Sequence, residues 1–162
     1  MKINELGLGG GCHWCTEAVF QSLRGVSDVR QGFLWSDPPD DAPSEGVLLQ
    51  VDREIIPLAA LLEIHLRTHA SGSDHSMREK YRSAVYVTNE EMAGEVTAVL
   101  GGVASSLGFE PVTKVLPLRG FQLNEKRFLN YRRSRPDAPF CRTYIDPKLA
   151  LLRREYTEYI ES

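Results

Sequence analysis

The chain is poor in cysteine, in long apolar runs and in positively charged clusters, and each shortage excludes a class of protein. Its three cysteines are an odd set, unlike the paired sets of disulfide-stapled secreted domains. No segment reaches the roughly 18 consecutive apolar residues that a membrane-spanning helix requires. The first residues show no cationic stretch followed by an apolar run, so we expect no secretory leader. These shortages favour a protein of the reducing cytoplasm that has no membrane partner.

Neither sign of charge is in large excess. Lys and Arg total 19 against 22 for Asp and Glu, which gives a net charge of −3 and a pI near 5.8. No basic stripe follows any segment, so we expect no nucleic-acid partner. A composition that is 42% hydrophobic and 25% charged is typical of a globular domain. Neither a repeat nor a linker interrupts the chain, and its length predicts one domain over residues 1–162.

Short β-rich segments alternate with helical ones along the chain. Gly25 is placed just past the end of a helix and Pro57 at the start of another, as their backbone preferences favour. The expected strands cover residues 3–8, 26–34, 46–51, 84–87 and 112–116, and the expected helices cover residues 13–23, 57–68, 89–106, 125–131 and 148–160. The initial β-α-β-β-α-β order is that of a ferredoxin-like core. We predict the α+β class, as a two-layer sandwich with extra C-terminal helices.

The most informative motif is Gly-Gly-Gly-Cys-His-Trp-Cys at residues 9–15. Cys12 follows an expected strand and opens an expected helix, whose free N–H groups favour an anion, so its thiol should ionise easily. The preceding glycines allow positive φ and close approach of a ligand to the backbone. Cys15 lies one turn further on and could capture an oxidised Cys12 as a disulfide. The motif indicates redox thiol chemistry.

Three other interpretations of the glycines and cysteines are weaker. A thioredoxin-like disulfide exchanger would suit a Cys-x-x-Cys motif, but here the motif follows the first strand, and no later strand starts with the expected proline. A zinc module would need a second paired motif, and none is present. The residues that could complete such a site are His13, His65, His69, His75 and Cys141. A dinucleotide site fails because Cys12 occupies the place of the third glycine.

Residues 11–20, Gly-Cys-His-Trp-Cys-Thr-Glu-Ala-Val-Phe, resemble the Gly-Cys-Phe-Trp signature of A-type peptide methionine sulfoxide reductases. Segments 61–69, 81–86 and 139–149 match that family in the same order, so the resemblance covers most of the chain. It implies a two-layer α+β sandwich and reduction of methionine-S-sulfoxide, in oxidised proteins or as the free amino acid. It also implies thioredoxin or another dithiol as reductant, with no metal and no organic cofactor.

The resemblance gives roles to four residues around the sulfoxide. Cys12 would attack the sulfur and become a sulfenic acid. Glu45, kept neutral by burial, would protonate the oxygen, and Tyr81 would hydrogen-bond to it. Trp14 would form one wall of the pocket for the terminal methyl group. The sulfenic acid then needs a resolving thiol.

Cys15 is the favoured resolving thiol, and Cys141 is the other candidate. Glu17, one turn after His13, should favour the helix start or pair with that imidazole.

Several departures mark a divergent member of the family. His13 replaces the signature phenylalanine and would shape the methyl pocket with a titratable ring. The loop at 35–44 is short and lacks a tyrosine. The family's aspartate, five residues before the matching tyrosine, falls on Ser76, and Asp74 can replace it only if the loop bends differently. Residues 125–129 lack the family's tyrosine, histidine and glutamine. A non-catalytic or altered-substrate thiol protein of the same fold is the alternative.

Overall fold

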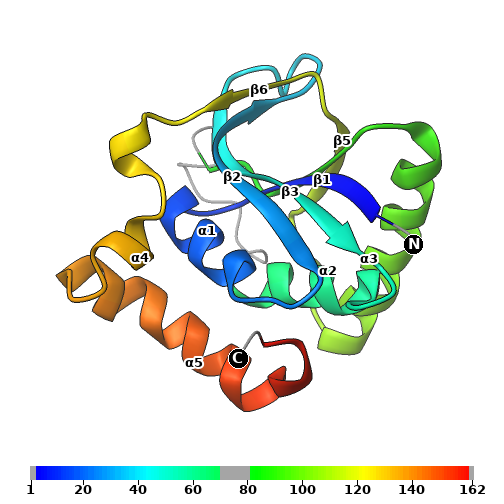
Figure 1. Ribbon diagram of the computed structural model, residues 1–162. Helices are drawn as coiled ribbons and strands as arrows, with labels where there is room; N and C mark the ends of the chain where they lie inside the picture. The colour runs from blue at the N-terminus through cyan, green and yellow to red at the C-terminus, as the bar shows by residue number, and fades with distance from the viewer. Residues whose placement is uncertain (1–2, 70–80, 161–162) are drawn as a thin grey trace.

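The computed structural model describes residues 3–69 and 81–160, in which one sheet is covered by helices (Figure 1). The strands are β1 (Ile3–Gly9), β2 (Val26–Trp35), β3 (Ser44–Asp52), β4 (Ala84–Val87), β5 (Lys114–Pro117) and β6 (Gly120–Leu123). The α-helices are α1 (His13–Gln21), α2 (Leu58–Arg67), α3 (Glu90–Leu107), α4 (Tyr131–Ser134) and α5 (Asp146–Glu155). Single helical turns lie at Lys126–Phe128, Cys141–Ile145 and Thr157–Tyr159.

The described strands form a six-stranded sheet in the order β5-β4-β1-β3-β2-β6. All neighbours are antiparallel except β4 and β5, which run parallel. The predicted α+β class is confirmed, and the five predicted strands are found with small shifts of their ends. Strand β6 is absent from the prediction because four residues, Gly-Phe-Gln-Leu, are too short to show a period.

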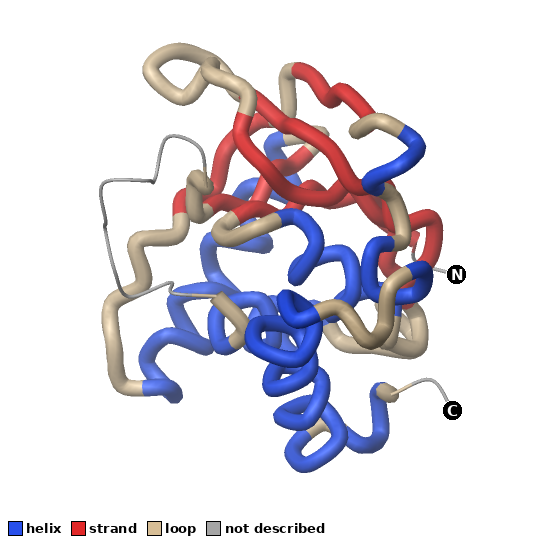
Figure 2. Tube along the Cα trace, turned by 90° about the vertical axis from the view of Figure 1, so that its left-hand side faces the viewer, coloured by secondary structure: helices blue, strands red, loops and turns tan. Residues whose placement is uncertain are grey.

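The central strands β1 and β3 are buried on both faces because their side chains alternate between two apolar layers. Most helices gather on one side of the sheet (Figure 2), and there Leu8 and Leu49 pack with Phe20 and Leu62 in the main core. On the other face a smaller cluster joins Leu34, Leu48, Ala84 and Tyr86. The helix α1, which starts beside the end of β1, is therefore held against a rigid support.

The C-terminal segment, which is the part of the chain after β6, runs along α1 (Figure 1). Near its end, Ile160 forms a β-bridge with Leu23, in the turn between α1 and β2. The helix predicted at 125–131 is divided in two, because Asn130 adopts a left-handed backbone with φ of 56°. The helix predicted at 148–160 starts earlier, at Asp146, and ends at Glu155. Within 3–69 and 81–160, no helix is both long and apolar enough to cross a membrane.

Candidate active site

Cys12 lies in the turn that joins β1 to α1. Gly10 has φ of 153°, and a Cβ at this position would come within 2.3 Å of the His69 ring, so only glycine fits. The carbonyl of Cys12 accepts hydrogen bonds from the N–H groups of Cys15 and Thr16 at 3.1 and 3.2 Å. Cys12 is thus the residue that precedes α1, as the motif predicts.

The two motif thiols differ in acidity because one donates to the other. A hydrogen bond from the Cys15 thiol, with smaller contributions from the backbone N–H groups of Trp14 and Cys15, lowers the pKa of Cys12 against the opposing effects of burial and Glu45. The same hydrogen bond, burial and the nearby Cys12 charge raise the pKa of Cys15. Cys12 is half-buried, Cys15 is buried, and both are free thiols. The pair can hold a thiolate at Cys12 next to a protonated Cys15.

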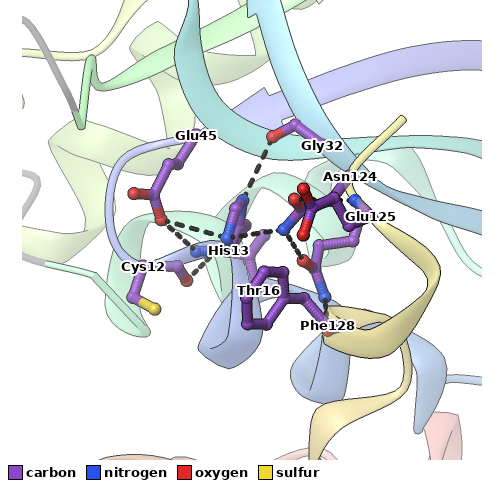
Figure 3. Close-up of polar contacts among 9 residues, drawn as sticks. Cys12, His13, Thr16, Gly32, Glu45, Asn124, Glu125 and Phe128 are labelled. Atoms are coloured by element: carbon purple, nitrogen blue, oxygen red, sulfur yellow. Dashed lines mark hydrogen bonds and ion pairs between the residues drawn. The ribbon is translucent and has the colours of Figure 1, made fainter. Parts of the chain in front are cut away.

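Glu45 is buried near the start of β3 and reaches the first residue of α1 (Figure 3). Its Oε1 accepts a hydrogen bond from the backbone N–H of His13 at 3.2 Å and lies 3.4 Å from the Nε2 of the same residue. The register of β1 and β3 explains this contact. Gly9, near the turn that contains Cys12, pairs with Gly46, so Glu45 lies next to that turn. A buried carboxyl therefore contacts the residue that directly follows a thiol of lowered pKa.

The His13 ring is turned inward toward β2 and β3, and its centroid lies 6.4 Å from that of Trp14. It is 6% exposed, its Nδ1 lies 3.2 Å from the carbonyl oxygen of Gly32, and its ring meets the edge of Phe33 at a centroid distance of 5.4 Å. The hydrogen-bonding groups of the imidazole explain this orientation, since Gly32 and Glu45 offer partners that a phenylalanine could not use.

Trp14 is packed into an aromatic cluster built largely by the C-terminal segment. Its ring stacks on Tyr131 at 4.0 Å with an interplanar angle of 3°, and Phe140 meets it edge-on at 5.3 Å. Phe128 lies at 6.2 Å. Sequence reasoning missed Tyr131 and Phe128 as neighbours of the site because their contacts join segments more than a hundred residues apart. The match of segment 139–149 to the family, which includes Phe140, is the sequence signal that points to this cluster.

Glu17 has a role that the sequence did not predict. It is 2% exposed, and its carboxylate accepts hydrogen bonds from the backbone N–H groups of Asn130 at 2.9 Å and Tyr131 at 3.2 Å. The expectation that Glu17 pairs with His13 or favours the helix start is therefore wrong. The carboxylate instead satisfies two backbone donors at the start of α4 and so fixes the ring that stacks on Trp14.

The remaining candidate residues differ in how closely they approach the motif. Tyr81 is half-buried, and the N–H of its neighbour Arg82 donates to the Oγ of Ser44 at 2.7 Å, directly before Glu45 on β3. Cys141 is fully buried and donates its S–H to the carbonyl of Arg135 at 3.2 Å. It belongs to the same apolar cluster as Cys15. Asp74 and Ser76 lie outside the described residues.

This arrangement defines the class of protein as a redox thiol enzyme: a thiol of lowered pKa, a second thiol one turn away and a buried carboxyl. In the described part of the chain, no group of three His, Cys, Asp or Glu side chains could hold a metal ion.

The family model for peptide methionine sulfoxide reductase matches residues 4–160. Peptide methionine sulfoxide reductase MsrA from Psychrobacter sp. (strain PRwf-1) is 33% identical over 170 aligned positions, covering 94% of this chain and 96% of the relative. The chain belongs to the peptide methionine sulfoxide reductase family, as the motif at 11–20 predicts. It is therefore an oxidoreductase whose activity is the thiol-dependent reduction of methionine sulfoxide.

Solved structures of related proteins support the fold. Methionine sulfoxide reductase A of Corynebacterium diphtheriae superposes with a TM-score of 0.71 at 19% identity, covering 84% of this chain and 76% of that one. Mxr1 from Saccharomyces cerevisiae in complex with Trx2 gives 0.59 at 17% identity, covering 78% and 84%. The mixed α+β architecture predicted from the sequence is thus shared with both proteins.

Proposed function

We propose that the chain reduces the S epimer of methionine sulfoxide with Cys12 as nucleophile, Glu45 as proton donor and Cys15 as resolving thiol. The observation that carries the proposal is the geometry of the motif: Cys12 directly precedes α1, Cys15 lies one turn further on, and the buried carboxyl of Glu45 accepts the backbone N–H of His13 between them at 3.2 Å. In this setting a hydrogen bond from Cys15 lowers the pKa of Cys12 and raises the pKa of Cys15. A thiolate is the reactive form of cysteine, and a protonated neighbour keeps it available until it is oxidised.

In the first half of the reaction the Cys12 thiolate attacks the sulfoxide sulfur while Glu45 gives its proton to the sulfoxide oxygen. The S–O bond breaks and the oxygen passes to Cys12, so the products are methionine and Cys12 sulfenic acid. The methionine sulfur is reduced by two electrons, and Cys12 is oxidised by two. Burial of Glu45 beside His13 supports its role, because a carboxyl must retain its proton to act as an acid.

In the second half Cys15 attacks the Cys12 sulfur, releases water and forms a disulfide. We favour Cys15 over Cys141 because Cys15 already donates to Cys12, whereas the fully buried Cys141 thiol donates to Arg135. An external dithiol then reduces the disulfide, and the complex of Mxr1 with Trx2 supports thioredoxin in this role. These steps require no metal and no organic cofactor. Free thiols suit a reducing compartment such as the cytoplasm.

The substrate would lie between Cys12 and Trp14, with its methyl group on the exposed part of the indole. Tyr81 would hydrogen-bond to the sulfoxide oxygen, and Asp74, or Ser76 in its place, would assist from the preceding loop. The half-buried state of Trp14 and Tyr81 is compatible with contact to a ligand. Oxidised proteins and the free amino acid remain the two proposed sources of substrate.

The scaffold for this chemistry would be one domain over residues 1–162 with a ferredoxin-like core. The order β4-β1-β3-β2, with each neighbouring pair antiparallel, supports that description. Strands β5 and β6 would then be additions at the two edges of the core.

The direct test is turnover of separated S and R methionine sulfoxide peptides with dithiothreitol, followed by mass spectrometry. We expect reduction of the S epimer alone and no turnover by Cys12→Ser. Reduction of neither epimer, with Cys12 still open to alkylation, would indicate an altered-substrate or non-catalytic thiol protein.

Single-turnover measurements test the resolving thiol. Cys15→Ser should release about one methionine per chain and accumulate Cys12 sulfenic acid, while Cys141→Ser should keep full turnover with thioredoxin. The reverse pattern would assign resolution to Cys141.

A further inference from the structure

The segment that packs on Trp14 is basic, although the chain as a whole is acidic. Residues 125–142 contain six Lys and Arg but only two Asp and Glu, whereas the chain has a net charge of −3. The expectation that no basic stripe follows any segment is therefore wrong for these residues. In the sequence the cations lie in short groups separated by apolar residues, and the structure folds the whole segment against α1 (Figure 1).

Half of these cations have a carboxylate partner. The pairs are Arg127–Glu125 at 2.7 Å, Arg132–Asp146 at 3.0 Å and Arg142–Asp137 at 3.8 Å. No carboxylate of the described residues pairs with the other three, Lys126, Arg133 and Arg135, and all three side chains are exposed. The carboxylate of Glu17, which also contacts this segment, is buried and already accepts two backbone N–H groups. The segment therefore presents positive charge that remains open to a ligand.

Two of the guanidinium groups lie over the rings that surround Trp14. The central carbon of the Arg135 guanidinium is 5.4 Å from the ring centroid of Tyr131, which stacks on Trp14. The same carbon of Arg127 is 4.6 Å from the centroid of Phe128, whose ring lies 6.2 Å from that of Trp14. The negative face of an aromatic ring attracts a guanidinium and so holds a flexible side chain in place. Positive charge is thus kept beside the half-exposed indole.

We propose that Lys126, Arg133 and Arg135, which we call the basic rim, bind acidic peptide segments, so that the protein prefers methionine sulfoxide flanked by Asp or Glu. This inference rests on the proposed function, in which the sulfoxide lies between Cys12 and Trp14. An extended peptide advances about 3.3 Å per residue. Side chains one to three residues from the sulfoxide therefore extend past the Trp14 ring to the basic rim, where opposite charges favour binding.

Of the two proposed sources of substrate, the basic rim favours oxidised proteins. Free methionine sulfoxide carries an ammonium and a carboxylate whose charges largely cancel, so it gains little from a positive surface. Phosphate groups of a nucleic acid would also pair with the cations, but the neighbouring thiol acts on methionine sulfoxide, which occurs in polypeptides. Thioredoxin meets the protein only after the sulfoxide is reduced. A charge effect measured with dithiothreitol alone therefore belongs to the substrate.

The test uses three peptides of equal length that carry methionine-S-sulfoxide flanked by two Asp, two Ser or two Lys residues. With dithiothreitol as reductant and low salt, kcat/KM should be about tenfold higher for the acidic peptide than for the basic one, because each exposed ion pair adds about 1.5- to 5-fold. The Ser peptide should lie between them. The ratio should approach one at 1 M salt, where the screening length falls to about 3 Å. Equal values for the acidic and basic peptides at low salt would overturn the proposal.

Arg135→Glu reverses one charge of the basic rim and keeps the backbone carbonyl that accepts the Cys141 thiol. The ratio of acidic to basic kcat/KM should fall by about threefold or more. The control is Arg153→Glu, the same change at an exposed side chain in the last turn of α5, and it should keep the ratio of the wild-type protein. Because each ratio is measured within one variant, a loss of folded protein cancels. A wild-type ratio in Arg135→Glu would overturn the role of this side chain.

Binding to Cys12→Ser separates this inference from the proposed function. Fluorescence anisotropy of labelled peptides should show tighter binding of the acidic peptide than of the basic one. That result would support the basic rim even if the wild-type protein reduced no peptide, which would count against the proposed function alone. Reduction of all three peptides with equal kcat/KM would count against the basic rim alone. Tighter binding of a single-stranded DNA of equal charge would overturn the assignment of a peptide ligand.

Discussion

At the scale of single residues, the two motif thiols show how position changes the chemistry of one side chain. Cys12 precedes α1 and receives hydrogen bonds, whereas Cys15 lies in the first turn, buried among apolar groups. Hydrogen bonds to a thiolate favour its formation, and burial without such bonds opposes it. The donor from Cys15 is the largest contribution to the lowered pKa of Cys12.

Removing that donor should make Cys12 less acidic. Cys15→Ala raises the pKa of Cys12, so less thiolate is present at neutral pH and alkylation by iodoacetamide slows, by about tenfold for each unit of change. Cys15→Ser keeps a hydroxyl donor and should retain most of the rate. The measurement is the alkylation rate of Cys12 against pH, by mass spectrometry. Cys141→Ala serves as a control, and an equal rate in all variants would contradict the assignment.

At the scale of elements, Glu17 joins α1 to α4 through two backbone N–H groups. These donors belong to the start of a four-residue helix that Asn130 separates from the preceding turn. Without an acceptor they would be left unsatisfied in a half-buried place. The stack of Tyr131 on Trp14 therefore depends on a carboxylate from another helix.

Glu17→Gln should destabilise the protein. The amide retains one acceptor oxygen but turns an N–H₂ group toward the second donor, so we expect a loss of about 1–3 kcal/mol in the free energy of unfolding. Urea unfolding followed by Trp fluorescence measures the change. Glu125→Gln makes the same substitution at an exposed carboxylate and should stay within about 0.5 kcal/mol. Equal stabilities for the two variants would reject the role of Glu17.

Some of these elements could be predicted from residues that are adjacent in the sequence, and others could not. Helix α1 and the place of Cys12 before it could be predicted, because glycines, a strand and a helical pattern are adjacent in sequence. The inward turn of His13 could not, since its partners come from β2, β3 and the segment after β6. The break at Asn130 was missed because left-handed backbone is set by the tertiary contacts around Glu17, and not by the propensity of residues 125–131.

At the scale of the whole molecule, charged and aromatic side chains far from the motif bind the C-terminal segment to α2. Arg67 on α2 donates to both carboxylate oxygens of Glu155 at 3.0 and 3.1 Å and to the hydroxyl of Tyr156 at 2.9 Å. The Tyr156 hydroxyl donates in turn to Glu63. Because the same segment supplies the rings around Trp14, this fastening also supports the candidate active site.

Stability should therefore fall at high pH in a way that depends on Tyr156. Burial and the hydrogen bond to Glu63 raise the pKa of Tyr156 from 10 to about 12. A group with a raised pKa in the folded state stabilises it fully below the unfolded value, and that stabilisation is lost as the pH rises through the folded value. Between pH 10 and 12 the folded protein binds more protons than the unfolded chain, so unfolding becomes easier.

Tyr156→Phe removes this titration together with its two hydrogen bonds. The variant should be less stable than the wild-type protein at neutral pH, by about 1–3 kcal/mol, and its decline between pH 10 and 12 should be shallower. Tyr86, whose pKa is also raised by burial, keeps part of the slope in both proteins. Urea unfolding at a series of pH values measures both effects, and Tyr144→Phe, at a 55% exposed side chain, should change neither. Parallel pH curves for wild type and Tyr156→Phe would show that this hydroxyl does not couple the C-terminal segment to α2.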